Sequence, residues 1–260
     1  MSSRNMIKIY SPDAIANISR AALLAAEVLE LAAQRVAPGV DTASIDEFCA
    51  SYIASRGALA APLNYRGFPK SICTSPNDVI CHGIPSPDVV LQDGDIVNID
   101  ITVFLDGYYG DTSRTVLVGE VPSGVKLFVE RAEKAMWKGI EAAVVGHRFN
   151  AIGDSIERYV KKFNYSVVRD YCGHGIGAAF HEDPAVLHYS SRSALPMLQN
   201  GMVFTVEPMI NMGKNWRSEV DQIDGWTART VDGSLSAQFE HTVAIVNGKA
   251  QVLSIPPHSI

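Results

Sequence analysis

The chain repeats itself, and two copies of one unit restrict its possible folds more than any other feature of the sequence. The segment PGVDTASIDEFCASYI aligns with GHRFNAIGDSIERYV at an offset of 107 residues, which pairs Gly39 with Gly146 and Ile45 with Ile152. Repeated units bury their apolar faces against one another. No linker-like run of Pro, Ser and Gly separates the copies. We therefore expect two pseudo-symmetric halves in one domain over residues 1–260, with a short N-terminal segment at 1–10.

Polar residues of the two halves match as well as apolar ones do. A chance repeat between segments of similar secondary structure would match apolar positions alone, because packing needs only those. The matched polar residues are therefore candidates for a shared site where the halves meet. The pairs are Gln92, Gly94 and Asp100 with Gln199, Gly201 and Glu207, then Asp111 with Glu240, and His82 with His174.

Each half begins with helices and continues with strands. A first helix is expected to begin at the SPD of residues 11–13 and to end by Pro38-Gly39. The second has Thr42 or Ser44 as its N-cap, and Ser44 with Glu47 matches a capping box. This order is typical of an α/β protein of the α+β kind, with antiparallel sheets backed by helices. Further helices are expected at about 124–144 and 150–163, and strands at YSVVRDYC, NGMVFTVEPMI and SLSAQFEHTVAIV.

A hairpin around the turn Asp106-Gly107 places two acids on one face of a buried strand. A two-residue turn pairs Leu105 with Tyr108. Asp100 and Asp111 then become diagonal neighbours about 7–8 Å apart at the backbone. The opposite face of the first strand is a continuous apolar stripe, so the strand is expected to be buried. Like charges repel, and a buried carboxylate is destabilising unless it is neutralised. A metal cation would remove both penalties.

Glu207 and Glu240 are expected to converge on these two acids if the halves face each other. Four carboxylates are balanced by two divalent cations, and two ions about 3.5–4 Å apart need bridging ligands. Asp111 and Glu240 are the symmetry-matched candidates for the bridges. His174, in the segment GHGIG, adds an imidazole nitrogen. A set of oxygens with one nitrogen favours Mn, Fe(II) or Co over a structural zinc held by thiolates.

Composition excludes several classes of protein. Lys and Arg number 22 and Asp and Glu 28, so the net charge of −6 argues against a nucleic-acid surface. The N-terminus MSSRNMIKIYSPDAI lacks the apolar core of a signal peptide, and no stretch is apolar for long enough to span a membrane. The four cysteines form no CxxC pair, which is typical of free thiols in a reducing compartment. We expect a cytoplasmic protein without membrane or nucleic-acid partners.

Five long blocks of the sequence resemble those of the type I methionine aminopeptidase family. They are NYRGFPKSICTSPNDVICHGIP, DGDIVNIDITVFLDGYYGDTSRT, YCGHGIGAAFHEDPAVLHY, GMVFTVEPM and DGWTARTVDGSLSAQFEHT. The resemblance implies the pita-bread fold, in which two pseudo-symmetric halves surround a central dinuclear metal site. It also implies a monomeric metalloaminopeptidase that removes the initiator methionine from nascent proteins when the second residue is small. Its partners would be nascent N-termini and, transiently, the ribosome.

The resemblance further implies a role for particular residues. Two divalent ions (Co, Mn, Fe(II) or Zn) would be held by Asp100, Asp111, His174, Glu207 and Glu240. His82 and His181 would face the substrate without binding metal. The pocket for the methionine side chain would be lined by Tyr65, Phe68, Cys73, Phe180 and Trp226. Asn77, Val79 and Ser236 resemble positions that hold a monovalent cation in some members.

These residues suggest hydrolysis of a peptide bond by a metal-activated hydroxide. Glu207 would shuttle the proton, His181 would stabilise the tetrahedral oxyanion, and His82 would contact the amide at the scissile bond. Two other functions stay open. One is another pita-bread peptidase, such as an X-Pro aminopeptidase, from which we would expect a further N-terminal domain. The other is a catalytically inactive relative that binds peptides, from which we would expect incomplete metal ligands.

Overall fold

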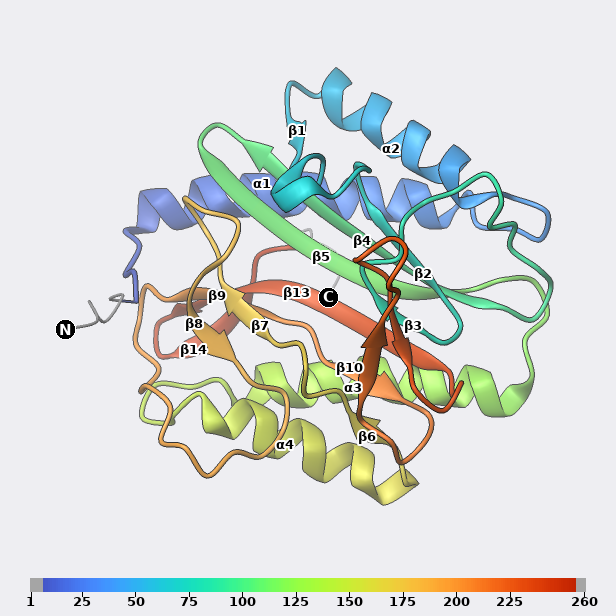
Figure 1. Ribbon diagram of the computed structural model, residues 1–260. Coiled ribbons are helices and arrows are strands. Elements are labelled where there is room, and N and C mark those ends of the chain that lie inside the picture. The colour runs from blue at the N-terminus through green and yellow to red at the C-terminus, as the bar shows by residue number, and fades with distance from the viewer. Residues whose placement is uncertain (1–6, 256–260) are drawn as a thin grey trace.

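The computed structural model describes residues 7–255, and its elements follow the order expected for two related halves (Figure 1). Each half opens with two helices. These are α1 (Pro12–Ala33) and α2 (Thr42–Ser55) in the first half, and α3 (Ser123–Ala142) and α4 (Asn150–Val160) in the second. Short 3-10 turns lie at Tyr65–Gly67 and Lys161–Phe163. None of the described helices is both long enough and apolar enough to cross a bilayer.

The strands follow the helices in each half. The first half holds β1 (Leu59–Ala60), β2 (Cys73–Pro76), β3 (Val79–Cys81), β4 (Ile96–Leu105) and β5 (Tyr108–Leu117). The second holds β6 (Ser166–Val167), β7 (Gly173–Gly175), β8 (Glu182–Val186), β9 (Val203–Val206), β10 (Met209–Asn211), β11 (Ser218–Val220), β12 (Ala228–Thr230), β13 (Ser236–Val246) and β14 (Lys249–Val252).

The two halves share one large antiparallel sheet. Its main path runs β1-β4-β5-β13-β9-β7-β8, while β2 adds to β4, β14 adds to β13, and β10 joins β13 to β6. A separate three-stranded sheet has the order β11-β12-β3. The halves meet where β5 pairs with β13, because β5 is the last strand of the first half and β13 belongs to the second. The expected junction of the two halves is therefore a continuous ladder of backbone hydrogen bonds.

Helices of each half cover the sheet of that half (Figure 1). One apolar cluster joins α1 and α2 to the inward side of β4, with Ile99, Ile101 and Val103 fully buried. A second joins α3 and α4 to β9 and β13, around Phe128 and Phe204. The apolar stripe expected opposite Asp100 thus packs under helices. This packing leaves the other face of β4, β5 and β13 free for polar side chains.

Several boundaries differ from those expected from the sequence. The first helix ends at Ala33, before Pro38, and the N-cap of α2 is Asp41, whose carboxylate accepts the N–H of Ser44. The expected capping box from Ser44 was therefore wrong. Asp41 has an extended backbone and directly precedes the first helical residue, Thr42, so its side chain and not that of Ser44 caps the helix. Pro208, which has no N–H, divides the expected strand NGMVFTVEPMI into β9 and β10.

Candidate metal centre

Three adjacent strands and one strand end bring the four matched acids together. Ser113 of β5 pairs with Asp100 of β4 on one side and with Glu240 of β13 on the other. Thr102 pairs with Asp111 across the β4–β5 hairpin, which is the register expected from its two-residue turn. Glu207 directly follows β9, whose Val206 pairs with His241 of β13. Acids from both halves therefore lie on one face of the sheet, along its central strands.

His174 stands among these acids. Its Nε2 lies 3.6 Å from Oε1 of Glu207 and 3.9 Å from Oδ2 of Asp111. One potential ligand atom each from Asp111, His174 and Glu240 lies within 4.8 Å of the other two. Within residues 7–255, His174 is the only basic side chain with a nitrogen within 4.0 Å of a carboxylate oxygen of these acids. A small cation fits where these atoms converge.

The imidazole of His174 is oriented as a metal-binding histidine would be. Its Nδ1 is 3.0 Å from the carbonyl oxygen of Gly175, which can only accept a hydrogen bond, so Nδ1 carries the proton. Burial lowers the pKa of His174 to about 4, and the ring is neutral at pH 7. The lone pair of Nε2 therefore faces Asp111 and Glu207. This arrangement, with the second ring nitrogen bonded to a carbonyl, is common among histidines that ligate metals.

Hydroxyl groups fix two of the carboxylates and leave the others without partners. Thr102 donates to Oδ1 of Asp111 at 2.8 Å, and Thr205 donates to Oε1 of Glu207 at 2.6 Å. Oδ1 of Asp100 and Oε1 of Glu240 are buried and accept no hydrogen bond within the described chain. A buried carboxylate oxygen without a partner is destabilising. The orphaned oxygens fit a set of ligands for divalent cations.

The electrostatics of the cluster agree with this fit. Burial raises the pKa of all four carboxyls above their usual values. The charges of neighbouring acids raise the pKa of Asp111, Glu207 and Glu240 further. Four acids that disfavour ionisation in one another's presence are typical of a site built for positive charge. A pair of divalent cations would provide that charge.

A cavity of about 360 Å³ opens onto the four acids. The residues expected from the sequence to hold divalent metal or substrate all line it: Asp100, Asp111, His174, Glu207, Glu240, His82, His181, Tyr65, Phe68, Cys73, Phe180 and Trp226. Their positions agree with the sequence analysis, while their roles stay predictions. The residues expected to hold a monovalent cation, Asn77, Val79 and Ser236, lie outside this lining. Apolar and aromatic side chains also line the cavity, and the ring of Trp226 lies edge-on to that of Phe68, with 5.2 Å between ring centroids. The cavity can hold an apolar side chain beside the carboxylates.

The two histidines outside the ligand set lie at different walls of this cavity. His181 stacks on Tyr65 with ring centroids 5.2 Å apart and lies 4.1 Å from the ring of His174. His82 has a left-handed backbone with φ of 57°, a conformation that is unusual for a residue with a side chain and that is often found at functional sites. Burial lowers the pKa of His82 to about 4 and that of His181 to about 3. Both rings are neutral hydrogen-bonding groups at pH 7.

Sequence reasoning missed other residues of the cavity wall. Tyr171 and Cys172 precede the GHG of β7, and Met209 follows Glu207 by two positions. Strand alternation around Glu207 and proximity to His174 were signals that could have identified them. Arg66 and Asp170 also line the cavity, but both lie outside regular strands. No periodicity marks such loop residues.

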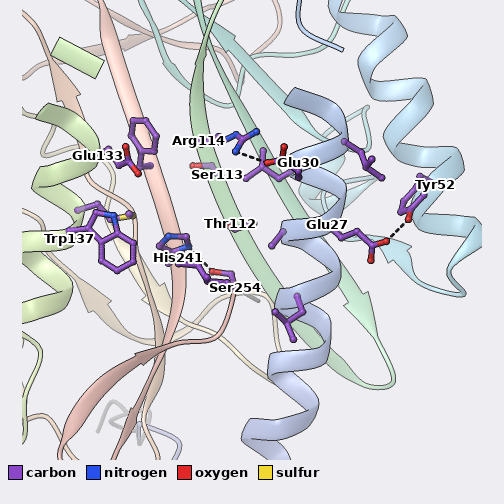
Figure 2. Close-up of a pocket in the computed structure, with 17 residues that line it drawn as sticks. Glu27, Glu30, Tyr52, Thr112, Ser113, Arg114, Glu133, Trp137, His241 and Ser254 are labelled. Carbon is purple, nitrogen blue, oxygen red and sulfur yellow. Dashed lines mark hydrogen bonds and ion pairs between the residues drawn. The ribbon is translucent and has the colours of Figure 1, made fainter. Parts of the chain in front are cut away.

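A larger cavity of about 930 Å³ lies on the opposite face of the sheet (Figure 2). Its floor includes Phe239 and His241, which flank Glu240 in β13 and therefore point away from it. Figure 2 shows that α1 and α3 form its two walls, with Arg114 paired to Glu30. None of the site residues expected from the sequence lines this cavity. Volume alone therefore does not locate the chemistry.

Comparisons with known proteins agree with the geometry of the smaller cavity. Metallopeptidase family M24 matches residues 16–247. A methionine aminopeptidase of Rickettsia prowazekii (strain Madrid E) is 48% identical over 254 residues, which cover 98% of this chain and 97% of that relative. A methionine aminopeptidase of Escherichia coli (strain K12) is 44% identical over 251 residues, which cover 96% of this chain and 94% of the relative.

Solved structures give the same result for the fold. The crystal structure of methionine aminopeptidase from Rickettsia prowazekii superposes with a TM-score of 0.93 at 49% identity, over 96% of this chain and 100% of that one. The enzyme from Thermotoga maritima gives a TM-score of 0.93 at 33% identity, over 96% and 100%. A prolidase from Pyrococcus furiosus is similar in fold alone, with a TM-score of 0.74 at 22% identity over 96% of this chain and 66% of that one.

Proposed function

The chain belongs to metallopeptidase family M24, and from this premise we propose that it is an aminopeptidase that removes the N-terminal methionine from polypeptides. The premise also explains the architecture, because the two halves joined by β5 and β13 form the pita-bread fold of the family. One observation carries the proposal. Acids from both halves and His174 converge in a cavity that apolar and aromatic side chains also line.

Two divalent ions would be held by the proposed ligands Asp100, Asp111, His174, Glu207 and Glu240. Two orphaned oxygens and the free Nε2 of His174 support this set. When bound, a pair of divalent ions supplies Lewis acidity, which polarises the scissile carbonyl and makes water a nucleophile at neutral pH. We propose Co, Mn, Fe(II) or Zn as the ions, and a monovalent cation near Asn77, Val79 and Ser236, where the N–H of Ser236 donates to the carbonyl of Asn77 at 2.9 Å.

Glu207 moves a proton in the proposed reaction. Thr205 fixes its Oε1, and the amide of Gln238 donates to its Oε2 at 3.2 Å, so the carboxylate has one orientation. In the metal-free protein, burial and the charge of Asp100 raise the pKa of Glu207 above its usual value. The carboxylate accepts a proton from the attacking water and passes it to the leaving amine.

The two histidines hold the substrate in the proposed complex. His181 is neutral and can donate one hydrogen bond to the oxyanion of the tetrahedral intermediate. His82 lies edge-on to Trp226, 6.1 Å between ring centroids, and contacts the amide beside the scissile bond. The side chain of methionine enters between Phe68, Trp226 and Cys73, where its flexible thioether packs against aromatic rings.

The remaining biology follows from this proposed reaction. Nascent polypeptides with a small second residue would be the substrates, and the protein would act as a monomeric single domain in the cytoplasm, meeting the ribosome transiently. An X-Pro peptidase is the nearest alternative, but the prolidase likeness concerns the fold alone. A shape-selected apolar pocket discriminates by about 1–3 kcal/mol per methylene, so a norleucine side chain should also be accepted.

Release of methionine from Met-Ala-Ser tests the proposal. The purified chain is prepared metal-free and assayed anaerobically with Mn(II), Co(II) and Fe(II) in turn. We expect release of methionine from Met-Ala-Ser and of norleucine from Nle-Ala-Ser, and no release from N-acetyl-Met-Ala-Ser or Met-Leu-Ser. Cleavage of an Ala-Pro peptide in preference to Met-Ala-Ser would favour an X-Pro enzyme. Failure to cleave any peptide with any metal would overturn the proposed activity.

A further inference from the structure

The loop between β7 and β8 carries two residues of the cavity, Phe180 and His181. It spans residues 176–181, and it contains no helix or strand. Its first anchor is a backbone bond from the N–H of Tyr109 to the carbonyl of Gly177, 2.8 Å. A loop of this kind needs other contacts to hold a side chain in one place.

Those contacts come from the other end of the sequence. The hydroxyl of Tyr10 accepts the N–H of Ala178 at 2.8 Å and donates to both carboxylate oxygens of Glu182, at 2.8 and 2.9 Å. Oε1 of Glu182 also accepts the N–H of Ala179 at 2.8 Å and the ammonium of Lys8 at 2.7 Å. Tyr10 and Glu182 therefore bind two adjacent backbone N–H groups of the loop, those of Ala178 and Ala179.

The ring of Tyr10 packs directly against the backbone of the loop at Gly177. A Cβ on Gly177 would lie 2.3 Å from Cζ and Oη of Tyr10, so only glycine leaves room for the ring. The N–H of Tyr10 donates to the carbonyl of Gly201 at 2.7 Å, which fixes its backbone to the sheet. The side chain of Glu182 is only 7% exposed, and burial strengthens a charge-assisted hydrogen bond.

The far side of the loop contacts the site. The ring of His181 lies 4.3 Å from that of Phe180 and 4.1 Å from that of His174, the proposed metal ligand. Glu182 directly follows His181, so the hydrogen bonds of the Glu182 carboxylate to Tyr10 and Ala179 restrain the backbone of His181. A displacement of about 1 Å of a catalytic group from its reactive position can lower the rate about a hundredfold. These hydrogen bonds are therefore close enough to matter for the reaction.

We propose that Tyr10 and Glu182 are positioning residues that hold His181 in its reactive orientation, so that residues 7–11 act as a strap across the active-site loop. The inference rests on the proposed aminopeptidase function. It assigns a role to the short N-terminal segment, and it predicts that the effect of this segment on kcat passes through His181. Lys8 contributes only the exposed end of the network, since its side chain is 51% exposed.

Tyr10→Phe keeps the ring and removes both hydrogen-bonding functions of the hydroxyl. Its matched control is Tyr108→Phe, because Tyr108 contacts Tyr10 edge-on at 6.5 Å and makes no hydrogen bond to the described loop. We expect kcat on Met-Ala-Ser to fall about five- to tenfold in Tyr10→Phe, with KM changed less than about twofold, and the control to match the wild type. Amide exchange in residues 177–182 of the metal-free protein should become about tenfold faster.

Two substitutions of Glu182 distinguish the effect of its hydrogen bonds from the effect of its charge. Glu182→Gln keeps a carbonyl oxygen that accepts the bonds from Ala179 and Tyr10, so it should stay within about twofold of the wild type. Glu182→Ala removes the acceptor and should match or exceed the loss in Tyr10→Phe. Asp183→Asn is the matched control, since it removes an exposed acid one position further along.

A double-mutant cycle tests whether the strap acts through His181. In the His181→Ala background, Tyr10→Phe should change kcat less than about twofold, because the group it positions is gone. Equal fold-losses in both backgrounds would overturn the inference and leave Tyr10 a stabilising residue only. Unchanged exchange and unchanged kcat in Tyr10→Phe would also overturn it. Absence of methionine release by the wild type would refute the proposed function instead, and the exchange result would still decide whether the strap orders the loop.

Discussion

Replacing Asp111 by Asn should stabilise the metal-free protein and destabilise the metal-loaded one. The carboxylate of Asp111 is 4% exposed and lies among three other acids, so the metal-free fold must bury charge against repulsion. Asn keeps the acceptor for the hydroxyl of Thr102, which now donates to Oδ1 of Asp111 at 2.8 Å, and removes the charge. An aspartate with a structural role would give the opposite sign without metal.

The dependence on pH follows from the titration of the cluster. Burial and the charges of the neighbouring acids raise the pKa of Asp111 well above its usual value of 3.8. A raised carboxyl pKa means that the folded state binds more protons, so the penalty grows as pH rises from about 4 toward 8. We expect Asp111→Asn to add about 1–3 kcal/mol to metal-free stability at pH 8, and less at pH 5.

Urea unfolding with EDTA and with Mn(II) measures the stability change of Asp111→Asn without metal and with metal. Saturating metal should stabilise the wild type by about 2.7 kcal/mol at a hundred times the Kd, and Asp111→Asn should lose most of that gain. Asp46→Asn is the matched control, because Asp46 is also buried but accepts the N–H groups of Ser71 and Ile72. Because Asp46 lies outside the cluster of four acids, its stability change should be the same with EDTA and with Mn(II). A less stable metal-free Asp111→Asn, with an unchanged response to Mn(II), would refute a charge cluster built for cations.

Three further predictions concern single side chains. His181→Ala should lower kcat about a hundredfold or more while unfolding free energy changes little, and an unaltered kcat would remove the oxyanion role. Thr205→Val leaves the N–H of His174 and Oε1 of Glu207 without their shared hydroxyl, so stability should fall by about 1–3 kcal/mol and metal affinity about tenfold or more, with Thr205→Ser restoring both in calorimetric titration. Burial lowers the pKa of His241 to about 4, so the folded state binds fewer protons and stability is lost as pH falls below about 6.5. His241→Gln should reduce that loss between pH 6.5 and 4.5, and identical slopes in urea unfolding would contradict it.

The parts of the site that depend on strand arithmetic could be predicted from the sequence. A two-residue turn fixes the register of the β4–β5 hairpin, so the shared face of Asp100 and Asp111 required no knowledge of the rest of the fold. The internal repeat then indicated that Glu207 and Glu240 would join them. In the structure, the pairing of β5 with β13 brings the acids of the two halves together.

Competition between similar local signals limited what else could be predicted. Asp41, Thr42 and Ser44 can all cap a helix, and only the backbone geometry of the first turn decides that Asp41 does so. The expected strand at YSVVRDYC shortens to Ser166–Val167, because only these two residues find a partner strand, β10. Sequence pattern reports what a segment prefers, whereas the neighbouring strand decides how much of it pairs.

The contact between Tyr10 and the β7–β8 loop had no sequence signal. Tyr10 and Glu182 are 172 residues apart, and neither belongs to a periodic pattern or to a repeated pair. Gly177 could be taken from the sequence as a flexible loop residue, but the structure shows that it makes room for the Tyr10 ring. Such contacts depend on the packed fold, in which the segment before α1 passes the β7–β8 loop.

The most direct test of the account is anomalous diffraction from crystals of the metal-free protein soaked in Mn(II). The account predicts two anomalous peaks inside the smaller cavity, both within bonding distance of side chains from the set Asp100, Asp111, His174, Glu207 and Glu240. Strong peaks elsewhere on the molecule, or ordered electron density for these five side chains with no anomalous signal between them at saturating Mn(II), would contradict a metal pair shared by the two halves.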